Sequence, residues 1–462
     1  MPGDWRFALT FLLLALSISA QAAAKLDPLA KSIQIDPRFA YYRDRSRESV
    51  VSEIKSNGYS CVRMVITRDS RADADLVKAF HDAGMAVWYQ TFGNGVYSTG
   101  DLPQGWENWR MKLRDKQPDE AAAGFVYLCL NNPEYCEWKK KQVVTTLKRI
   151  PFDGFEIAEP FLPAFNGPES PYYGCLCDKC RDAFLKMYPG ERAIPDFTDE
   201  KSPSYYLTNR RLYKKWMDFR VRSVVSFLDD IINGPGGVRE ECPHVKVSVW
   251  GIADDIPNAV ETIREWEGLD GALIAKTVRP DLYVIQTDWP DWSKADLPPE
   301  YPLKYKPFVE AIRAVSKLSI ILQADVGSFE NCRRGSDWMA KCDAAARKAG
   351  MIGITSYEYH LNRDIYEAPP RLVAARGSGE TITLTFTKRL DPASASDTTN
   401  YSVQSGKVLA AQVDGNLVRL LVEGHPTKLS ASNLWDDPRR RFFRNYPAAA
   451  MKGESSLPVN WR

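Results

Sequence analysis

Acidic side chains at the ends of predicted strands are the first candidates for chemistry. The run from Asp153 is rich in strand-forming residues and ends in a carboxylate, Glu159. Two carboxyl groups can cleave an acetal, because one protonates the departing oxygen while the other attacks the anomeric carbon or activates water. Glu159 is therefore the first candidate for the general acid/base, and Glu156 is the alternative on the same run. Side chains alternate along a regular strand, so the two should face opposite ways, and an ion pair would explain either one without catalysis.

The second carboxylate has three candidates, which are Asp288, Asp325 and Glu358. Each follows or ends a later strand-like run, and the sequence alone does not rank them. Aromatic and amide side chains near the same strand ends would hold sugar hydroxyls and sugar faces, although core packing is the better explanation for each of them taken alone. The candidates for substrate binding are Trp250, Asp288, Trp289, Gln323 and Tyr357.

Cys175, Cys177 and Cys180 form a C-x-C-x-x-C motif that brings three thiols together. Three thiolates and one further ligand make the tetrahedron that a structural zinc site uses. Cys129 and Cys136 follow the third strand-like run, whose loop neighbours the motif in a barrel, so either could be the fourth ligand. A disulfide with free thiols is the alternative, because an oxidising compartment favours it, and nine cysteines leave at least one unpaired.

Other chemistries leave no signature in the chain. There is no HExxH zinc motif, no GxSxG nucleophile motif and no glycine-rich phosphate turn after the first strand-like run. We therefore expect no cofactor for catalysis. The 61 Lys and Arg residues against 59 Asp and Glu give a net charge of +2, which is far from the basic excess that nucleic-acid binding needs.

Eight strand-like runs alternate with amphipathic stretches between residues 33 and 360, as in repeated βα units around a parallel sheet. This pattern predicts an α/β fold, a (β/α)8 TIM barrel, over residues 25–370. The runs are residues 32–42, 61–67, 85–92, 152–159, 245–252, 281–288, 319–325 and 351–359.

Two long insertions, residues 93–136 and 160–208, follow the third and fourth runs. Each lies between a strand and a helix, which predicts that both lie at the carboxyl end of the barrel, where such barrels build active sites. The alternative architecture is an open doubly wound sheet, but the phosphate turn that a nucleotide site in such a sheet would use is missing.

After Pro369-Pro370 the hydrophobic period changes to two, and Asp414-Gly415-Asn416 is a hairpin signal. Residues 371–435 are therefore predicted to form a small all-β sandwich. The stretch at residues 386–403 resembles bacterial immunoglobulin-like modules of secreted proteins. Residues 436–462 show no clear periodicity and are left unassigned.

Residues 1–24 have the order of a secretory signal peptide: Arg6, a short apolar run and the small residues SAQAAA before Lys25. The apolar run is shorter than the ~20 residues that a spanning helix needs, so a retained membrane anchor is the weaker interpretation. We expect a secreted or periplasmic protein without a membrane span after signal cleavage.

Three segments together resemble the middle of family 42 β-galactosidases and related barrel-type glycosidases. They are residues 129–135, 153–159 and 175–184, about 60 residues with the stretches that flank them. The resemblance implies a zinc site formed by Cys129 and the three motif cysteines, and it implies that Glu159 is the acid/base. Ala158 stands where the family has an Asn, and Asp325 and Glu330 stand where it has a nucleophilic Glu.

The sequence as a whole predicts an exported glycoside hydrolase that cleaves O-glycosidic bonds of an oligo- or polysaccharide. The proposed acid/base is Glu159, and the proposed partner is Glu358 or Asp325. Two rival functions remain, a non-catalytic carbohydrate-binding barrel and a cell-surface structural protein in which the sandwich is the working part.

Overall fold

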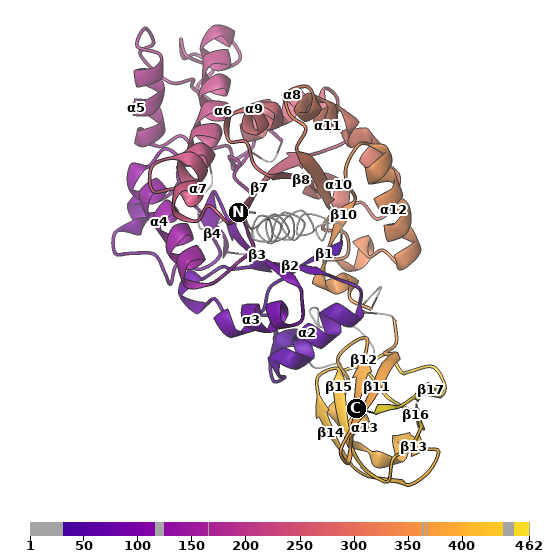
Figure 1. Cartoon of the computed structure of the whole chain (residues 1–462). Coiled ribbons are helices and arrows are strands. Elements are labelled where there is room, and N and C mark those ends of the chain that lie inside the picture. The colour runs from indigo at the N-terminus through magenta and orange to yellow at the C-terminus, as the bar shows by residue number, and fades with distance from the viewer. Residues whose placement is uncertain are drawn as a thin grey trace, which may run out of the picture. The chain divides into compact units, whose positions relative to one another are not determined.

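The computed structural model describes residues 31–115, 124–164, 166–362, 365–366, 368–437 and 448–461. The predicted signal peptide, residues 1–24, lies outside the described residues. Eight parallel strands close into a barrel with helices around it (Figure 1), which confirms the predicted TIM barrel. The strand order around the barrel is β1-β10-β9-β8-β7-β6-β3-β2.

Each of the eight strand-like runs of the sequence overlaps a barrel strand. The barrel strands are β1 (Ser32–Ile35), β2 (Cys61–Val65), β3 (Ala86–Phe92), β6 (Gly154–Ala158), β7 (Lys246–Ala253), β8 (Leu282–Thr287), β9 (Ser319–Gln323) and β10 (Ile354–Tyr357). β1 ends much earlier than its predicted run, because Pro37 lacks the N–H that a strand ladder needs.

Helices separate the barrel strands, as the amphipathic stretches predicted. They are α2 (Arg47–Ser56), α3 (Ala74–Asp82), α4 (Pro133–Arg149), α5 (Asp178–Met187), α6 (Arg210–Asn233), α7 (Val238–Glu241), α8 (Ala259–Glu267), α9 (Gly271–Thr277), α10 (Trp289–Trp292), α11 (Lys306–Arg313) and α12 (Ser336–Lys348). Their ends follow local rules: Ser46 caps α2 by accepting the Ser49 N–H, and Asn132 caps α4. No described helix is long and apolar enough to cross a membrane.

The chain divides into two compact units. One holds the described residues up to Arg63, Lys78–Val87 and the chain from Thr355 onward, and the other holds Met64–Val77 and Trp88–Ile354. The second unit contains both long insertions. In the first insertion, β4 (Gly95–Val96) and β5 (Val126–Tyr127) pair antiparallel. The second insertion carries α5.

The C-terminal region forms two sheets, consistent with the predicted sandwich. Its elements are β11 (Leu372–Ser378), β12 (Thr381–Phe386), α13 (Pro392–Ser396), β13 (Tyr401–Val403), β14 (Lys407–Asp414), β15 (Leu417–Glu423), β16 (Lys428–Ala431), β17 (Ser455–Pro458) and β18 (Asn460–Trp461). The sheet orders are β14-β15-β12-β11-β18 and β13-β16-β17. The predicted hairpin turn connects β14 to β15, and Gly415 has the positive φ of 60° that such a turn requires.

β17 and β18 lie in the stretch that the sequence left unassigned. β17 pairs with β16, and β18 pairs in parallel with β11, so both complete sheets begun about 30 to 85 residues earlier in the chain. Short edge strands contribute few apolar positions of their own, and this explains why periodicity did not reveal them.

Candidate active site

Four acidic residues follow four barrel strands that are neighbours in the closed sheet, β6, β7, β8 and β9. Glu159, Asp254 and Asp288 come directly after β6, β7 and β8, and Asp325 comes two residues after β9. Carboxyl ends of parallel strands meet at one end of a barrel, so the fold itself gathers these acids there. Three of the four were candidates from the sequence, and Asp254 was not recognised.

Glu159 has a left-handed backbone conformation, with φ at +48°. A non-glycine residue in this region is uncommon and costs roughly 1 kcal/mol or more, and such strain concentrates at functional sites. The conformation also ends the regular alternation of β6 at Ala158. The direction of the Glu159 side chain is therefore set by this turn and not by the pleat of the strand.

Glu156 lies on the opposite side of β6 from Phe155. The Phe155 ring contacts the Tyr89 ring, and the Tyr89 hydroxyl donates a hydrogen bond to Asp69, which lies between the sheet and α4. Phe155 therefore faces the helices outside the barrel. Glu156 thus faces the barrel interior, where it is fully buried and accepts a hydrogen bond from Ser248 of β7 at 2.9 Å. It is a core residue of the barrel.

The ends of β3 and β6 approach closely beside Glu159. The Gly93 N–H donates to the Ala158 carbonyl at 2.7 Å. A Cβ on Gly93 would lie 3.0 Å from the Cα of Pro160 and 3.1 Å from its Cβ, so only glycine fits without displacing the chain after Glu159. This contact fixes the turn that carries the carboxylate.

Asp325 is half-buried, and its Oδ1 is buried without a hydrogen-bond partner among the described residues. Burial, with a smaller contribution from the Glu159 carboxylate, raises the pKa of Asp325 to about 8, against a hydrogen bond with Ser328 that lowers it. Burial raises the pKa of Glu159 to about 7, and the Asp288 carboxylate contributes. Both groups therefore keep protons near neutral pH.

Asp288 caps α10, and its Oδ1 accepts the Trp289 N–H at 2.7 Å. Burial raises its pKa to about 7, and Asp254 and Asp291 add to the increase. Asp291 is fully buried and anchors α10, because it accepts hydrogen bonds from the Asp255 N–H at 2.8 Å and the Tyr305 hydroxyl at 2.7 Å. Burial and the neighbouring Asp291 raise the pKa of Asp254 to about 6.

Two tyrosines from the β4-β5 pair lie close enough to the acids to feel their charge. Burial raises the pKa of Tyr97, and the Glu159 and Asp325 carboxylates raise it further. The pKa of Tyr127 is raised by burial and then by Glu159. The Tyr97 ring is held edge-on by Phe92 and Phe125 at 5.0 and 4.8 Å. Sequence reasoning missed both tyrosines, because the insertion has no periodicity that would orient them.

The remaining predicted substrate-binding residues differ in exposure. Trp250 lies within β7, and its exposed fraction is 2%. Gln323 is the last residue of β9 and is fully buried. Both are core residues of the barrel. Trp289 is 46% exposed. Tyr357 ends β10, is buried, and stacks on Tyr359 with ring centroids 5.2 Å apart.

Glu358 belongs to the other compact unit from Glu159 and Asp325. It is buried, and its two carboxylate oxygens accept the Asp36 N–H at 3.3 and 3.2 Å. This contact joins the end of β10 to the end of β1. A structural role therefore accounts for the burial of Glu358.

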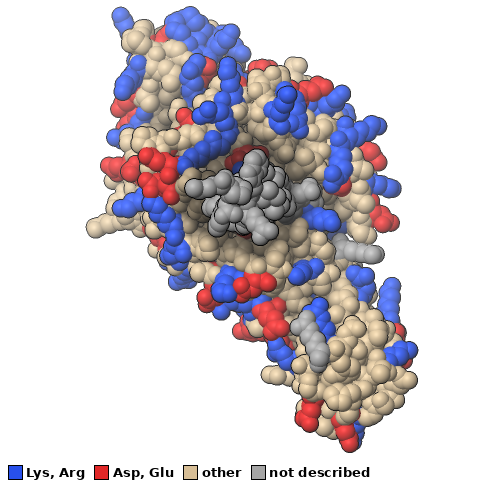
Figure 2. Space-filling view, in the orientation of Figure 1, with Lys and Arg blue, Asp and Glu red and all other residues tan. Residues whose placement is uncertain are grey.

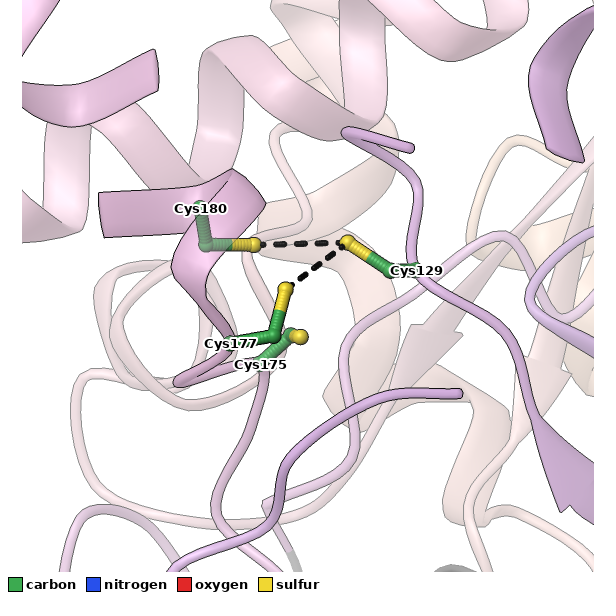
Figure 3. Close-up of side chains that lie close together, drawn as sticks. All are labelled: Cys129, Cys175, Cys177 and Cys180. Atoms are coloured by element: carbon green, nitrogen blue, oxygen red, sulfur yellow. Dashed lines mark hydrogen bonds between the residues drawn. The ribbon is translucent and has the colours of Figure 1, made fainter. Parts of the chain in front are cut away.

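The four cysteines that the resemblance selected lie together, with sulfur atoms within 4.8 Å of one another (Figure 3). Cys129 lies 3.5 Å from both Cys177 and Cys180, and no cysteine of the chain is in a disulfide. Cys136 lies on α4 instead, where its thiol donates to the Leu130 carbonyl at 3.2 Å. The gathering of Cys129 with the C-x-C-x-x-C motif is thus as expected.

The geometry of these thiols fits a metal ion. A tetrahedral site with Zn–S bonds of about 2.3 Å has sulfur atoms roughly 3.8 Å apart, close to the spacing of Cys129 and its neighbours. Asn131 adds N–H donors to the sulfurs, with its backbone N 3.4 Å from Cys129 and its Nδ2 3.3 Å from Cys180. Such donors accompany thiolate ligands because they spread the negative charge. The cluster can therefore bind a metal.

The sequence matches no protein-family model and no curated protein. Solved structures do resemble the chain. The PgaB (BpsB) glycoside hydrolase domain from Bordetella bronchiseptica matches with a TM-score of 0.52 and 14% identity, over 71% of this chain and 94% of that chain.

Two further similar structures have lower scores. An endo-1,4-β-D-mannanase from Thermotoga petrophila gives a TM-score of 0.32 at 9% identity, over 71% of this chain and 87% of the other. A family 36 α-galactosidase from Geobacillus stearothermophilus gives 0.36 at 11% identity, over 85% of this chain and 55% of the other. The likeness to the Bordetella bronchiseptica domain establishes a shared barrel fold.

Proposed function

We propose that this protein is a glycoside hydrolase that cleaves O-glycosidic bonds of a glycan with Glu159 and Asp325. The observation that carries the proposal is the strained Glu159 at the end of β6, which interacts with Asp325 across the carboxyl end of the barrel. Glu159 follows β6 and Asp325 follows β9, and two other strands lie between these strands in the barrel. Such a pair can act on opposite sides of one glycosidic bond.

Glu159 acts as the general acid, because a pKa of about 7 lets it hold a proton at neutral pH and release it to the leaving oxygen. Asp325 in its ionised form attacks the anomeric carbon or takes a proton from water. The working state needs one proton between the two groups. With pKa values of about 7 and 8, the one-proton state is most populated between these values, and because Asp325 holds its proton more tightly, the form with Glu159 protonated and Asp325 ionised is the minor part of that state. Activity should therefore rise toward pH 7 and fall above pH 8.

Asp325 is a better partner for Glu159 than the other two candidates. Asp288 already accepts the Trp289 N–H as a helix cap, and Glu358 accepts the Asp36 N–H. Asp325 has a buried oxygen with no hydrogen bond within the described chain, and its pKa responds to Glu159. An oxygen without a partner is available for substrate or for an attacking water.

Several features support a glycan substrate outside the cytoplasm. The resemblance to family 42 β-galactosidases and the glycoside hydrolase structures that share the fold point to saccharides. The order of residues 1–24 and the immunoglobulin-like sequence at residues 386–403 favour a secreted or periplasmic protein. The four-cysteine cluster would hold a structural zinc, because four thiolates complete the tetrahedron of ligands that zinc uses.

The test measures hydrolysis of a glycan panel and of dinitrophenyl glycosides of the same sugars by Glu159→Gln and Asp325→Asn variants, with Glu310→Gln on α11 as a surface control. Glu159→Gln should lose about 10²–10⁴-fold on glycans but much less on dinitrophenyl glycosides, because that leaving group departs without a proton. Asp325→Asn should lose both activities.

Glycan binding without hydrolysis by the wild-type protein would support the carbohydrate-binding rival. Wild-type rates in both carboxyl variants would exclude the proposed pair. The masses of the products identify the bond that is cleaved. The pH–rate profile of the wild-type protein is then compared with the expected rise toward pH 7 and fall above pH 8.

A further inference from the structure

We propose that Trp292 and Phe329 form a stacking platform for a sugar ring beside the carboxylates, and that the substrate is consequently a glycan chain. The proposal rests on the proposed function for the position of the cleaved bond. It adds one binding site, formed by two loops. On each loop the aromatic residue lies several residues after the acid. Phe329 was not among the substrate-binding residues expected from the sequence.

The platform is aromatic, with Phe329 exposed to solvent and Trp292 partly buried. Phe329 is 54% exposed, which makes it the most exposed of the large apolar side chains in the described chain. Its ring centroid lies 5.2 Å from that of Trp292, with the planes 35° apart. Trp289, at the start of the same helix α10, is 46% exposed. Trp292 and Phe329 thus contact each other between the segments that follow β8 and β9, and Trp289 is a further exposed aromatic on the first of these segments.

The two loops are bound to each other, so the exposure of Phe329 does not come from a loose segment. Asn331 donates to the Ser293 carbonyl at 3.4 Å, and Arg334 donates to the Lys294 carbonyl at 2.7 Å. The Phe329 N–H donates to the Cys332 sulfur at 3.3 Å. A rigid aromatic face loses little conformational entropy when a ligand stacks on it.

The platform is continuous with the acids along both loops. Trp292 lies four residues after Asp288, on the helix that Asp288 caps. Phe329 lies four residues after Asp325 and directly follows Ser328, whose hydroxyl donates to the Asp325 carbonyl at 3.3 Å. We therefore expect a ligand that contacts both Asp325 and the platform to extend beyond one ring.

A pyranose suits this surface because its C–H face is apolar and its edge carries hydroxyl groups. The aromatic rings match the face, and the carboxyl groups of the adjacent site match the edge. Loss of one aromatic ring from such a stack should weaken binding about 5- to 10-fold.

The test measures binding by calorimetry with cellohexaose, mannohexaose, xylohexaose and chitohexaose and with their monosaccharides, using Glu159→Gln for any sugar that is cleaved. At least one hexaose should bind tenfold or more tightly than its monosaccharide. Phe329→Ala and Trp292→Ala should each remove most of that gain and leave monosaccharide affinity unchanged. Phe329→Tyr, which keeps the ring, should retain it. Trp435→Ala removes a 45% exposed aromatic of the C-terminal region and is the matched control.

Equal affinity for hexaose and monosaccharide, no binding of any hexaose, or full hexaose affinity in Phe329→Ala would each overturn the platform. Loss of self-association in Phe329→Ala, measured by sedimentation with sugar binding intact, would show instead a contact between copies of the chain. Tight hexaose binding without cleavage by the wild-type protein would retain the platform while the hydrolase proposal fails.

Discussion

At the scale of single residues, the candidate site combines backbone strain with buried acids. Glu159 has a left-handed backbone, and burial raises the pKa values of Glu159, Asp288 and Asp325 to about 7, 7 and 8. Burying a charged carboxylate disfavours the folded state, so these acids cost stability whenever they ionise. Proteins commonly accept such a cost where a site needs reactive groups.

A neutral replacement of either acid should stabilise the protein at high pH. A carboxyl group whose pKa is raised in the fold binds its proton more tightly there than in the unfolded chain. The free energy of unfolding therefore falls as pH rises from about 4 through 7–8. Glu159→Gln and Asp325→Asn should be more stable than wild type by roughly 1–3 kcal/mol at pH 9 and equal to it near pH 4.

Urea unfolding at both pH values measures this difference. The exposed Glu310→Gln variant should show no such gain. Wild-type stability that stays level between pH 5 and pH 9, once the control is subtracted, would mean that the acids are not held protonated by the fold.

At the scale of elements, the cysteine cluster joins the two long insertions. Cys129 follows β5 in the first insertion, while the C-x-C-x-x-C motif opens α5 in the second. Asn131 connects the cluster to α6, because its Nδ2 also lies 3.0 Å from the Ser223 hydroxyl. The cluster thereby ties together loops that have little regular structure of their own.

Removing one thiol of the cluster should release the metal and loosen this join. Cys177→Ser is expected to reduce bound zinc from about one equivalent to well below half, and to lower the midpoint of thermal unfolding, because metal binding contributes to folding free energy. Plasma emission analysis and calorimetry measure the two effects.

Cys136→Ser is the matched control, since that thiol lies outside the cluster on the neighbouring α4. Less than half an equivalent of zinc in the wild-type protein, with the four thiols unreactive because they are oxidised, would favour the disulfide alternative. Equal zinc in Cys177→Ser and wild type would also exclude the proposed ligand set.

At the scale of the whole molecule, Lys, Arg, Asp and Glu are mixed over the visible face (Figure 2), in keeping with the net charge of +2. Charged side chains are also buried within the first compact unit. They lie between the C-terminal sheets on one side and α2 with the residues that precede it on the other. Arg389 donates to the carbonyls of Tyr41 at 2.8 Å and Arg43 at 2.6 Å and pairs with Asp437 at 3.2 Å. Glu53 pairs with Arg45 at 2.7 Å, and neither side chain is exposed.

Loss of Arg389 should therefore destabilise the whole unit. Arg389→Ala leaves the buried Asp437 carboxylate and two carbonyls without their partner, and breaking a buried pair in this way costs about 3–5 kcal/mol. Chemical unfolding measures the loss, with Arg376→Ala, an exposed arginine of β11, as the control. A loss in Arg389→Ala no larger than that of the control would mean that the C-terminal sheets fold independently of α2.

The amino-acid sequence by itself determined the barrel, because alternating apolar periods and helix caps are local signals that repeat eight times. It also determined the hairpin at Gly415 and the three-cysteine motif, since turn geometry and close thiol spacing act over a few residues. Glu159 was found for the same reason, as an acid that directly ends a strand.

Only the tertiary structure decided how distant residues combine. It brought Asp325 within range of the Glu159 charge, and it buried Glu156 and Trp250 inside the barrel. It also brought Tyr97 from an irregular insertion to the acids, and it added β17 and β18 to sheets formed much earlier in the chain. These outcomes depend on contacts between segments far apart in sequence, where burial and charge are set by neighbours that no local pattern encodes.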